Sequence, residues 1–483
     1  MNHKAIFSTL RKMLMAEGFL LLLPMIVSII YGEDFKPFLF VAVFLIIVGG
    51  VKNLKASTDP IYTKDGIVIV GLCWLLWSAF GALPFVISGS IPNFIDAFFE
   101  VVSGFTTTGS SILTEVESLP KGMLFWRSFT HWVGGMGVLV FVSALIPLVK
   151  SRSMSILRAE MPGPNADKLV PKTKQTAQIL YIIYFVLSAI MTVLLMCGGM
   201  PLFDSLCTMF GTAGTGGFSV RNASIAAYGS PYAEIVITVF MCLFSLNFSV
   251  YFLLLVRKFK TVAKNEEMWT FIGLFVVSTA IITWNVLSYG NYSDTGEAVR
   301  ASAFQVSSIM STSGFSTANF SNWPWLSQCL LFILMLIGAC AGSTGGGMKV
   351  VRLVLTRKII KRDLKKIARP KDVSKIRLDG NVVEESMLSG VKTYMLIYFV
   401  IFFVSFTILM FEGKDLVTTI SSVATCFNNI GPGLGDIVGP AGNFSSWSYF
   451  GKIILSLDML LGRLEIYPIL LLFMPAVWKK KSI

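Results

Sequence analysis

Four short segments of this chain carry residues that can bind an ion through backbone oxygens. Each combines Thr, Ser or Asn with glycine: Phe105-Thr106-Thr107-Thr108-Gly109, Thr215-Gly216-Gly217-Phe218, Thr312-Ser313-Gly314-Phe315 and Asn428-Asn429-Ile430-Gly431. A dehydrated ion needs oxygen ligands, and closely spaced backbone carbonyls supply them when the chain is extended and otherwise strained. Glycine permits that conformation, and the neighbouring polar side chains can satisfy backbone groups that would lack a partner.

The repetition of these segments favours an ion site over a simpler interpretation. Taken singly, each glycine is better explained as a turn or a small helix-packing contact. However, Gly109, Gly217, Gly314 and Gly431 recur roughly every 100 residues, each between two apolar runs. A short helix ending at each glycine would also point the negative end of its dipole at a cation. The pattern therefore predicts a cation-selective pore built by one chain.

The composition places the chain in a membrane. Of its 483 residues, 54% are hydrophobic and only 14% are charged, which is too apolar for an ordinary soluble protein. The net charge of +13 comes mainly from basic residues in short links between apolar runs, so we interpret it as membrane topology and expect no nucleic acid as a partner. The seven cysteines and two histidines suggest neither a disulfide framework nor a metal centre, and we expect the cysteines to be small buried residues.

About ten apolar runs approach the 20 residues that a membrane-spanning helix needs. They lie near residues 14–31, 37–52, 66–89, 123–149, 177–199, 232–256, 270–289, 325–352, 393–411 and 449–478. Shorter and more polar segments lie at 93–108, 202–215, 299–313 and 415–429, and these fit re-entrant half-helices. The first run follows Lys4, Arg11 and Lys12 and lacks a small-residue cleavage site, so we expect a retained helix and not a signal peptide.

The charges in the links predict how the spans are oriented. Basic clusters occur at alternate ends of the spans, whereas acidic residues such as Glu115, Asp204, Asp294 and Asp436 occupy the opposite links. The positive-inside rule puts the basic clusters inside. All four glycine segments should then face the outside.

The segment from Gly338 to Gly347 interrupts an apolar run with small, helix-breaking residues. Glycine costs a helix interior about 1 kcal/mol relative to alanine, so three in succession, Gly345 to Gly347, predict local unwinding. Irregular backbone at membrane depth must line a water-filled path or be buried in protein, and close helix packing through small residues is the alternative. Lys349, which follows, is expected either to pair with a carboxylate or to lie at the inner mouth of the pore.

Arg463 lies within the apolar run from Gly451 to Trp478. A guanidinium costs at least about 2.5 kcal/mol there, so it should face the pore or a buried partner. A structural ion pair with Glu465 or Asp458 is the alternative, although neither is at the ideal helical spacing. The residues assign no role to three further polar side chains in or near apolar runs: Arg127, His131 and Asp458.

The combination of these motifs resembles the Trk/Ktr/HKT superfamily of potassium transporters, and within it the TrkH type, the membrane subunit of bacterial Trk systems. The resemblance rests on the four glycine segments, extended by Ser219, Ser316 and Pro432-Gly433-Leu434-Gly435, and on three further motifs: Arg158-Ala159-Glu160-Met161-Pro162-Gly163-Pro164, Gly342-Ser343-Thr344-Gly345-Gly346-Gly347-Met348-Lys349-Val350 and Gly462-Arg463-Leu464-Glu465. These cover the chain from about residue 60 to its end, and the extra helices before residue 60 resemble the TrkH type more than the shorter Ktr type.

The resemblance implies potassium uptake through a selectivity filter. The implied filter residues are Thr107, Thr108, Gly109, Gly216, Gly217, Ser313, Gly314, Asn429, Ile430 and Gly431, with potassium held at Thr108, Gly109, Gly217, Gly314 and Gly431. In plant relatives a serine at the first glycine position accompanies sodium preference, so Gly109 favours potassium. The implied gate consists of a mobile loop containing Gly345, Gly346 and Gly347, with Lys349 and with Arg463 as a positive barrier in the pore.

We therefore expect an all-α polytopic membrane protein with four pseudo-repeats of helix, re-entrant pore half-helix and helix around a central pore. The expected boundaries are an N-terminal helix pair at 1–60, pore repeats at 61–165, 166–264 and 265–355, a basic cytoplasmic linker at 356–390, and a fourth repeat at 391–483. The resemblance places the chain in the bacterial inner membrane as a multi-pass protein.

The resemblance also implies partners. It suggests a homodimer regulated by a cytosolic, TrkA-type nucleotide-binding subunit, so that control by ATP, ADP or NAD would arrive through that partner, and this chain would carry no cofactor. The stretch from Arg357 to Arg377 has ten Lys or Arg against two Asp. It can serve as positive-inside anchoring to anionic membrane lipid, as a docking surface together with Arg158 to Pro164, or as both.

Four other functions are weighed against potassium uptake. An enzyme is disfavoured, because the chain has no HExxH, no GxSxG with plausible partners and no complete GxxxxGK[ST] loop. A symporter with inverted repeats would repeat several spanning helices and not helix, half-helix, helix. A sodium- or proton-coupled potassium symporter, or a less selective cation transporter, stays open.

Overall fold

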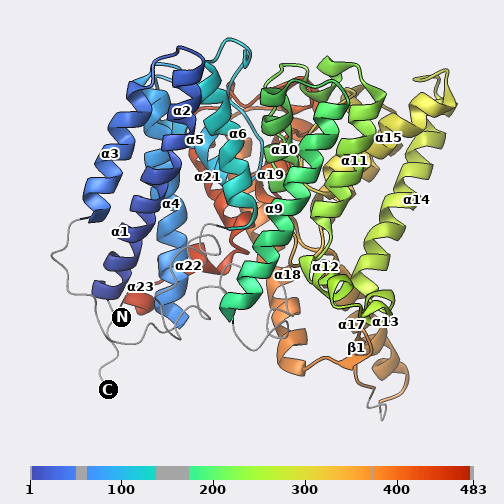
Figure 1. The fold of residues 1–483 in the computed structure, drawn as a ribbon. Helices are drawn as coiled ribbons and strands as arrows, with labels where there is room; N and C mark the ends of the chain where they lie inside the picture. Colours follow the sequence, from blue (N-terminus) through green and yellow to red (C-terminus); the bar gives the residue numbers. More distant parts are fainter. Residues whose placement is uncertain (1–2, 51–62, 138–172, 371–373, 479–483) are drawn as a thin grey trace.

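The computed structural model describes residues 3–50, 63–137, 173–370 and 374–478, and these residues form a bundle of helices (Figure 1). Five helical stretches are long and apolar enough to cross a membrane: His3–Ile30, Asp65–Ile87, Gln178–Cys197, Glu266–Ser288 and Glu385–Met410. Two helices, α11 (Pro231–Ser245) and α12 (Phe248–Leu255), meet at 89° and would make a sixth span if counted together.

Four short helices end at the four glycine segments: α5 (Phe94–Phe105), α10 (Leu202–Gly214), α15 (Thr295–Met310) and α19 (Leu416–Phe427). The starts of three are fixed by side chains that accept hydrogen bonds from the first turn, namely Asn93, Asp294 and Asp415. The fourth follows Pro201, whose fixed φ suits a helix start. We call these four the short helices.

Each short helix packs against the helices that precede and follow it. Helix α5 contacts α4 (Thr63–Ile87) and α6 (Lys121–Gly135), and α10 contacts α9 (Thr173–Cys197) and α11. Helix α15 contacts α14 (Glu266–Ser288) and α16 (Trp325–Ile337), and α19 contacts α18 (Glu385–Met410) and α21 (Tyr449–Arg463). The longer helices therefore surround the short ones, whose glycine ends are buried.

The remaining elements extend this bundle at its edges. Helices α1 (His3–Leu20), α2 (Leu22–Ile30) and α3 (Lys36–Gly50) pack on one another and reach α4 and α6. The short connections hold the 3₁₀ helices η1 (Ser224–Tyr228) and η2 (Phe320–Asn322) and helices α13 (Phe259–Ala263), α20 (Gly435–Val438), α22 (Tyr467–Leu472) and α23 (Pro475–Trp478). Helix α17 (Val350–Ala368) and a two-stranded hairpin lie at the lower edge in Figure 1.

The expectation of about ten uninterrupted spans is not met by the described residues, because several runs break. The run at 325–352 is helical only to Ile337 and resumes as α17 at Val350, which confirms the predicted unwinding around the three glycines. The run at 449–478 breaks after Arg463, where Glu465 and Ile466 both have positive φ. Arg463 therefore ends a helix, whereas we had expected it in the middle of a run. The end of the run at 123–149 lies outside the described residues.

The expected basic linker at 356–390 is largely structured. Helix α17 continues to Ala368, and α18 already begins at Glu385, before the expected boundary at 391. Between them, β1 (Arg377–Leu378) and β2 (Asn381–Val382) pair antiparallel across Asp379-Gly380, which both have positive φ as a two-residue hairpin turn requires. Helix α17 forms because its residues Val350, Val351, Val354 and Leu355 bury one apolar face.

The expectation of buried cysteines is wrong at two positions. All seven cysteines are free, but Cys197 and Cys329 are exposed on the protein surface. Both lie in apolar helical surroundings, where hydrophobic side chains also face outward, as a lipid-facing surface permits.

Candidate ion pathway

The four glycine segments share one backbone conformation at the ends of the short helices. We call them loops 1 to 4: Thr106–Gly109, Thr215–Phe218, Thr312–Phe315 and Asn428–Gly431. In each, one residue is left-handed, with φ between 55° and 59°: Thr107, Thr215, Thr312 and Asn429. The glycine two positions later also has positive φ, between 74° and 110°, at Gly109, Gly217, Gly314 and Gly431. The conformation therefore repeats residue for residue.

The hydrogen bonds that end each short helix repeat as well. The residue after the left-handed position donates its N–H to the carbonyl five residues earlier: Thr108 to Ser103 at 2.8 Å, Gly216 to Gly211 at 2.7 Å, Ser313 to Ser308 at 2.9 Å and Ile430 to Thr425 at 3.0 Å. This is the Schellman pattern, which usually places glycine at the left-handed position. Here a threonine or asparagine occupies it. A β-branched residue with positive φ is strained, and such strain tends to persist where it serves a site.

The four loops close into a ring. A Cβ atom at Gly109 would meet the carbonyl oxygen of Gly216, one at Gly217 would meet that of Ser313, and one at Gly314 would meet that of Ile430. At Gly431 it would lie 2.9 Å from the carbonyl oxygen of Thr108, which returns to loop 1. The order is therefore 1, 2, 3, 4 and back to 1, and each glycine makes room for its neighbour's backbone.

The carbonyl groups at these contacts are available to an ion. Those of Thr108, Gly216, Ser313 and Ile430 accept no hydrogen bond from the residues that the structure describes. Buried backbone carbonyls are nearly always paired, so four unpaired ones at equivalent positions of a ring are unusual. The short helices also direct the negative ends of their dipoles at the ring. The arrangement suits a dehydrated monovalent cation.

A cavity opens onto the ring on one side. Its lining includes all four glycines, Gly109, Gly217, Gly314 and Gly431, together with hydroxyl-bearing and amide side chains. Arg127 and Arg221 also reach its wall. The cavity gives an ion a polar approach to the ring.

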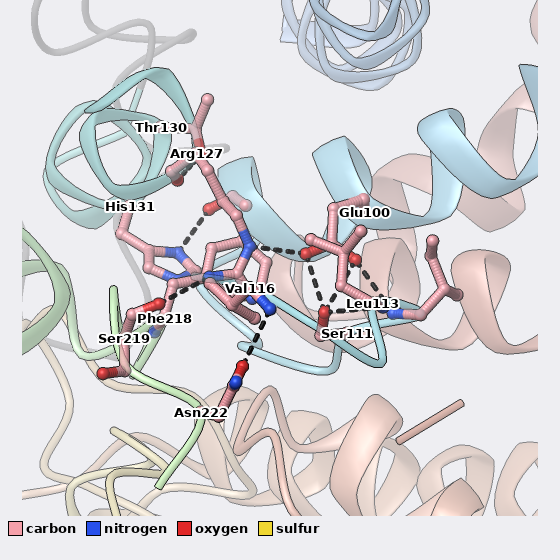
Figure 2. A network of polar contacts seen from close by, with 12 residues as sticks. Glu100, Ser111, Leu113, Val116, Arg127, Thr130, His131, Phe218, Ser219 and Asn222 are labelled. Atoms are coloured by element: carbon pink, nitrogen blue, oxygen red, sulfur yellow. Dashed lines mark hydrogen bonds and ion pairs between the residues drawn. The ribbon is translucent and has the colours of Figure 1, made fainter. Parts of the chain in front are cut away.

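A buried polar cluster holds loops 1 and 2 in place (Figure 2). Arg127 on α6 donates to Glu100 of α5 at 2.6 Å and to the carbonyl of Ser219 at 2.9 Å, and its guanidinium lies 3.6 Å from the centre of the Phe218 ring. Glu100 also accepts from the N–H of Ile112 at 2.9 Å. The ion pair therefore ties α5 and α6 to the segments that follow both loops.

His131 supplies a second link between loops 1 and 2. The N–H of Phe218 donates to His131 Nε2 at 3.2 Å, so the proton of a neutral ring lies on Nδ1, which is 2.7 Å from the carbonyl of Gly104. The ring fills the space beside Gly216, where a Cβ atom would collide with it. His131 thus positions the backbone of loop 2 against the end of α5, a role that the sequence left unassigned.

Replacing Glu100 with glutamine should destabilise the protein strongly. The side chain of Arg127 is only 4% exposed, and the change leaves its charge without a counter-ion, at a cost of about 3–5 kcal/mol. We expect a clear fall in the thermal unfolding midpoint of the detergent-purified protein. Glu117→Gln is the control, because Glu117 pairs with Arg221 where both side chains are 42% exposed, and its loss should cost about 1 kcal/mol or less. Equal effects of the two changes would contradict this account.

The segment 338–349, which we call the inner loop, lies against the ring on the side away from the cavity. The N–H of Gly346 donates to the Thr312 hydroxyl at 2.7 Å, and a Cβ atom at Gly346 would meet the backbone of Asn428. The chain can pass this close only because Gly345 and Gly346 lack side chains. The inner loop therefore touches loops 3 and 4 directly.

Basic side chains hold the carbonyls of the inner loop. Arg463 donates to Thr344 at 2.6 Å and to the α6 carbonyls of Gly135 at 3.0 Å and Gly134. The amine of Lys349 donates to the carbonyl of Gly345. Of the two carboxylates considered as partners for Arg463, Glu465 pairs with Arg352 at 2.5 Å and Asp458 accepts from Ser405. Arg463 thus bridges the inner loop and the end of α6.

Glu267, which the sequence analysis did not identify, also binds the inner loop. One carboxylate oxygen of Glu267, at the start of α14, accepts from the N–H of Ala341 at 2.6 Å and from that of Val351 at 3.1 Å. The only available signal was an acidic residue opening an apolar run, and this is equally typical of an ordinary helix start. Its long-range partners are visible only in three dimensions.

The structure brings the predicted site residues together in two adjoining groups. The ring contains Thr107, Thr108, Gly109, Gly216, Gly217, Ser313, Gly314, Asn429, Ile430 and Gly431. The inner loop and its contacts contain Gly345, Gly346, Gly347, Lys349 and Arg463. Their roles in ion conduction stay predictions. Among the described His, Cys, Asp and Glu side chains, no group of three or more is placed to hold a metal ion.

Comparisons with known proteins agree along nearly the whole chain. A family model named TrkH and described as a cation transport protein matches residues 36–480. The Trk system potassium uptake protein TrkH of Salmonella typhimurium is 36% identical over 468 residues, covering 95% of this chain and 96% of that one, and TrkH of Halomonas elongata is 34% identical, covering 99% and 100%. The crystal structure of the potassium transporter TrkH from Vibrio parahaemolyticus matches with a TM-score of 0.88 at 31% identity, covering 99% and 100%.

Proposed function

Because this chain belongs to the TrkH family of cation transport proteins, we propose that it takes up potassium across the cell membrane through the ring of loops 1 to 4. It is a multi-pass membrane protein, and its relatives are named potassium uptake proteins. The observation that carries the proposal is the ring itself, in which four loops share one conformation and four carbonyls accept no hydrogen bond from the described part of the chain. This ring would act as the selectivity filter.

In the proposed filter, potassium exchanges its water for backbone oxygens. The carbonyls of Thr108, Gly216, Ser313 and Ile430 are the first candidates, and the adjoining glycines Gly109, Gly217, Gly314 and Gly431 allow the loops to approach one another. A filter of this kind selects by the number and field strength of its oxygens and by its size. An inside-negative potential contributes about 2.3 kcal/mol per charge per 100 mV, so inward flow needs no catalytic step in this chain.

The proposed architecture is four units of helix, short helix and helix around the filter, with boundaries at 61–165, 166–264, 265–355 and 391–483. The packing of each short helix between its two sequence neighbours supports such units. Residues 1–60 would add a helix pair outside the first unit, and the N-terminal helices contact α4 and α6 accordingly.

The inner loop would be the gate, and the hydrogen bonds from Arg463 and Lys349 to its carbonyls would hold it closed. It contacts loops 3 and 4 directly, and it carries three positive-φ glycines, Gly338, Gly342 and Gly347, that permit an unwound path. Arg463 adds a positive charge where it bonds the inner loop to α6. Release of these few contacts would let the inner loop move away from the ring.

Replacing Gly347 with alanine should raise potassium flux and leave ion selectivity unchanged. Gly347 has φ of 80°, and a Cβ atom there would lie 2.6 Å from Gly338 Cα, so alanine strains the closed loop. A strain of about 1–2 kcal/mol raises the open population about fivefold or more. The measurement is flux of potassium and sodium in liposomes. Gly390→Ala is the control, because Gly390 has open space around it. A changed potassium-to-sodium ratio, or unchanged flux, would refute the gate.

We also propose that the chain works as a homodimer under a cytosolic, TrkA-type nucleotide-binding subunit, in keeping with relatives named as parts of a Trk system. Helix α17 ends in basic residues that include Lys361, Lys365 and Lys366, on the same edge as the hairpin. That edge suits either such a subunit or anionic lipid. Arg158 to Pro164, the other expected docking motif, lies outside the described residues.

One experiment separates potassium uptake from its alternatives. The purified chain in liposomes is given equal gradients of potassium or sodium, with and without a proton gradient. We expect potassium flux well above sodium flux and no stimulation by the proton gradient. Equal fluxes would indicate a less selective cation transporter, and proton-dependent accumulation would indicate a coupled symporter.

A further inference from the structure

Asp458 is a buried carboxyl group that the proposed conduction path does not use. It lies on α21, its residue is 1% exposed, and Oδ1 accepts a hydrogen bond from the Ser405 hydroxyl of α18 at 2.7 Å. Oδ2 is buried and has no hydrogen-bond partner among the residues that the structure describes. Only one of the two buried carboxyl oxygens therefore has a hydrogen-bond partner among the described residues.

The charged groups on the helices packed against α21 are engaged elsewhere. On α5, Asp96 pairs with Lys452 at 2.6 Å and Glu100 pairs with Arg127 at 2.6 Å. At the end of α19, the Cys426 thiol lies 3.7 Å from the Ser110 hydroxyl. The other titratable or charged groups of these helices also have partners. The Tyr398 hydroxyl bonds to Asn428, and Lys392 and Glu385 form ion pairs with Asp363 and Arg362. Tyr394 packs beside Arg352 and Tyr467, and Arg463 donates to carbonyls of the inner loop and α6.

This environment suits a neutral acid. A buried carboxylate without a cation beside it is costly, whereas a protonated carboxyl carries no charge and needs only hydrogen-bond partners. In the acid, the Ser405 hydroxyl still donates to Oδ1 while Oδ2 carries the proton. Ionisation would leave a negative charge on Oδ2 that nothing in its described surroundings offsets.

The backbone beside Asp458 is joined to the ring. The carbonyl of Met459 accepts from the Asn429 amide at 2.9 Å, and the same amide donates to the Thr108 hydroxyl at 3.0 Å. Asn429 is the left-handed residue of loop 4, and Thr108 belongs to loop 1. A charge on Asp458 can be relieved only by a shift of α21 or by entry of water, and either would disturb this bridge.

We propose that Asp458 is a proton-binding site in the wall behind loop 4, and that loss of its proton distorts the ring and lowers ion flux. The inference rests on the proposed function, since flux is what the proton controls. The site lies beside the ion path and not within it. Flux therefore depends on pH without any proton moving with the ion.

The test compares potassium flux at equal pH on both sides of the liposome, from neutral to alkaline. Wild-type flux is expected to fall about fivefold as Asp458 ionises, the lower end of ordinary couplings between sites. Asp458→Asn should hold its neutral-pH flux throughout. Ser405→Ala removes the donor that stabilises the carboxylate, so the potassium flux of this variant should fall at a higher pH than that of wild type. Glu17→Gln is the matched control, because Glu17 is also fully buried with neither oxygen partnered in the described structure, but lies on α1 away from loop 4.

An alkaline fall that persists in Asp458→Asn, or that disappears in Glu17→Gln, would overturn the proposal. If Asp458→Asn does not fold, an unmoved profile in Ser405→Ala overturns it in the same way. Thermal unfolding supplies a readout that needs no transport. As pH rises, wild type should lose stability relative to Asp458→Asn, because folding must then keep a proton that the unfolded chain has released. A wild type without potassium flux at any pH would refute the proposed function, while this stability difference would still decide the proton site.

Discussion

Replacing Gly109 with serine is expected to lower the potassium-to-sodium flux ratio about tenfold, a change of about 1.4 kcal/mol in relative barrier height. Gly109 has φ of 83°, which a serine adopts only with strain, and its Cβ would meet the carbonyl oxygen of Gly216 in loop 2. That carbonyl is one of the four that we propose as ligands. The serine must push it aside, so the ring loses the geometry that distinguishes the larger ion from the smaller.

The control for this change separates backbone strain from contact with the ring. Gly89 also has positive φ, 73°, but nothing lies within 4 Å of a Cβ atom placed there. Gly89→Ser should therefore keep the wild-type selectivity and lose only a little stability. The measurement is the ratio of the two fluxes in liposomes under matched gradients. A ratio for Gly109→Ser equal to that of wild type would remove Gly109 from the filter.

The sequence predicted the four loops because they recur, but not how they are held. Glycine at 109, 217, 314 and 431 is a local signal of unusual backbone. By contrast, Thr107, Thr215 and Thr312 give no signal of a left-handed conformation, since β-branched residues disfavour it, and only Asn429 is of a type that tolerates it. That conformation is imposed by the end of each short helix and by the neighbouring loop. It is a tertiary effect, and no local propensity encodes it.

The contacts that fasten the inner loop were beyond sequence reasoning for a related reason. Glu267 holds Ala341 and Val351 from a helix that begins more than 70 residues earlier in the chain. Arg463 reaches carbonyls contributed by α6 and by the inner loop. For Arg463, the apolar run and the cost of a charge indicated a buried partner, but we had considered carboxylates as alternatives to the pore. Backbone carbonyls carry no sequence signature, so they could not be foreseen.

Where helices end was predicted least well, again for a physical reason. Apolar runs at 325–352 and 449–478 satisfy the length rule for a span, yet the helix breaks within both. In the first, three glycines signalled the break. In the second, Pro468 follows closely and lacks the N–H that would continue the helix past Leu464, a local signal that we had not used. The Glu465 ion pair with Arg352 also holds this turn. Hydropathy detects burial but cannot distinguish an intact helix from one that neighbours bend.

Replacing Arg463 with alanine is expected to raise potassium flux about tenfold while the potassium-to-sodium ratio stays unchanged. The change removes the hydrogen bonds to Thr344, Gly134 and Gly135, and with them the link between the inner loop and α6. It also removes a positive charge beside the path of a cation. Hydrogen bonds to a charged donor each contribute about 1.5–3 kcal/mol, so loss of even one is enough for a tenfold shift toward the open loop.

A second substitution shows whether the rise in potassium flux comes from loss of the positive charge or from loss of the hydrogen bonds that tether the inner loop to α6. Arg463→Lys keeps the positive charge, but an ammonium on a flexible stem cannot reproduce the planar fork that reaches Thr344 and Gly135 together. If the charge is the barrier, the lysine variant should conduct as slowly as wild type. If the tether is the barrier, it should conduct nearly as fast as the alanine variant. Because the guanidinium is shared between two segments that are far apart in sequence, we expect the tether to contribute more. Wild-type flux in Arg463→Ala would exclude both.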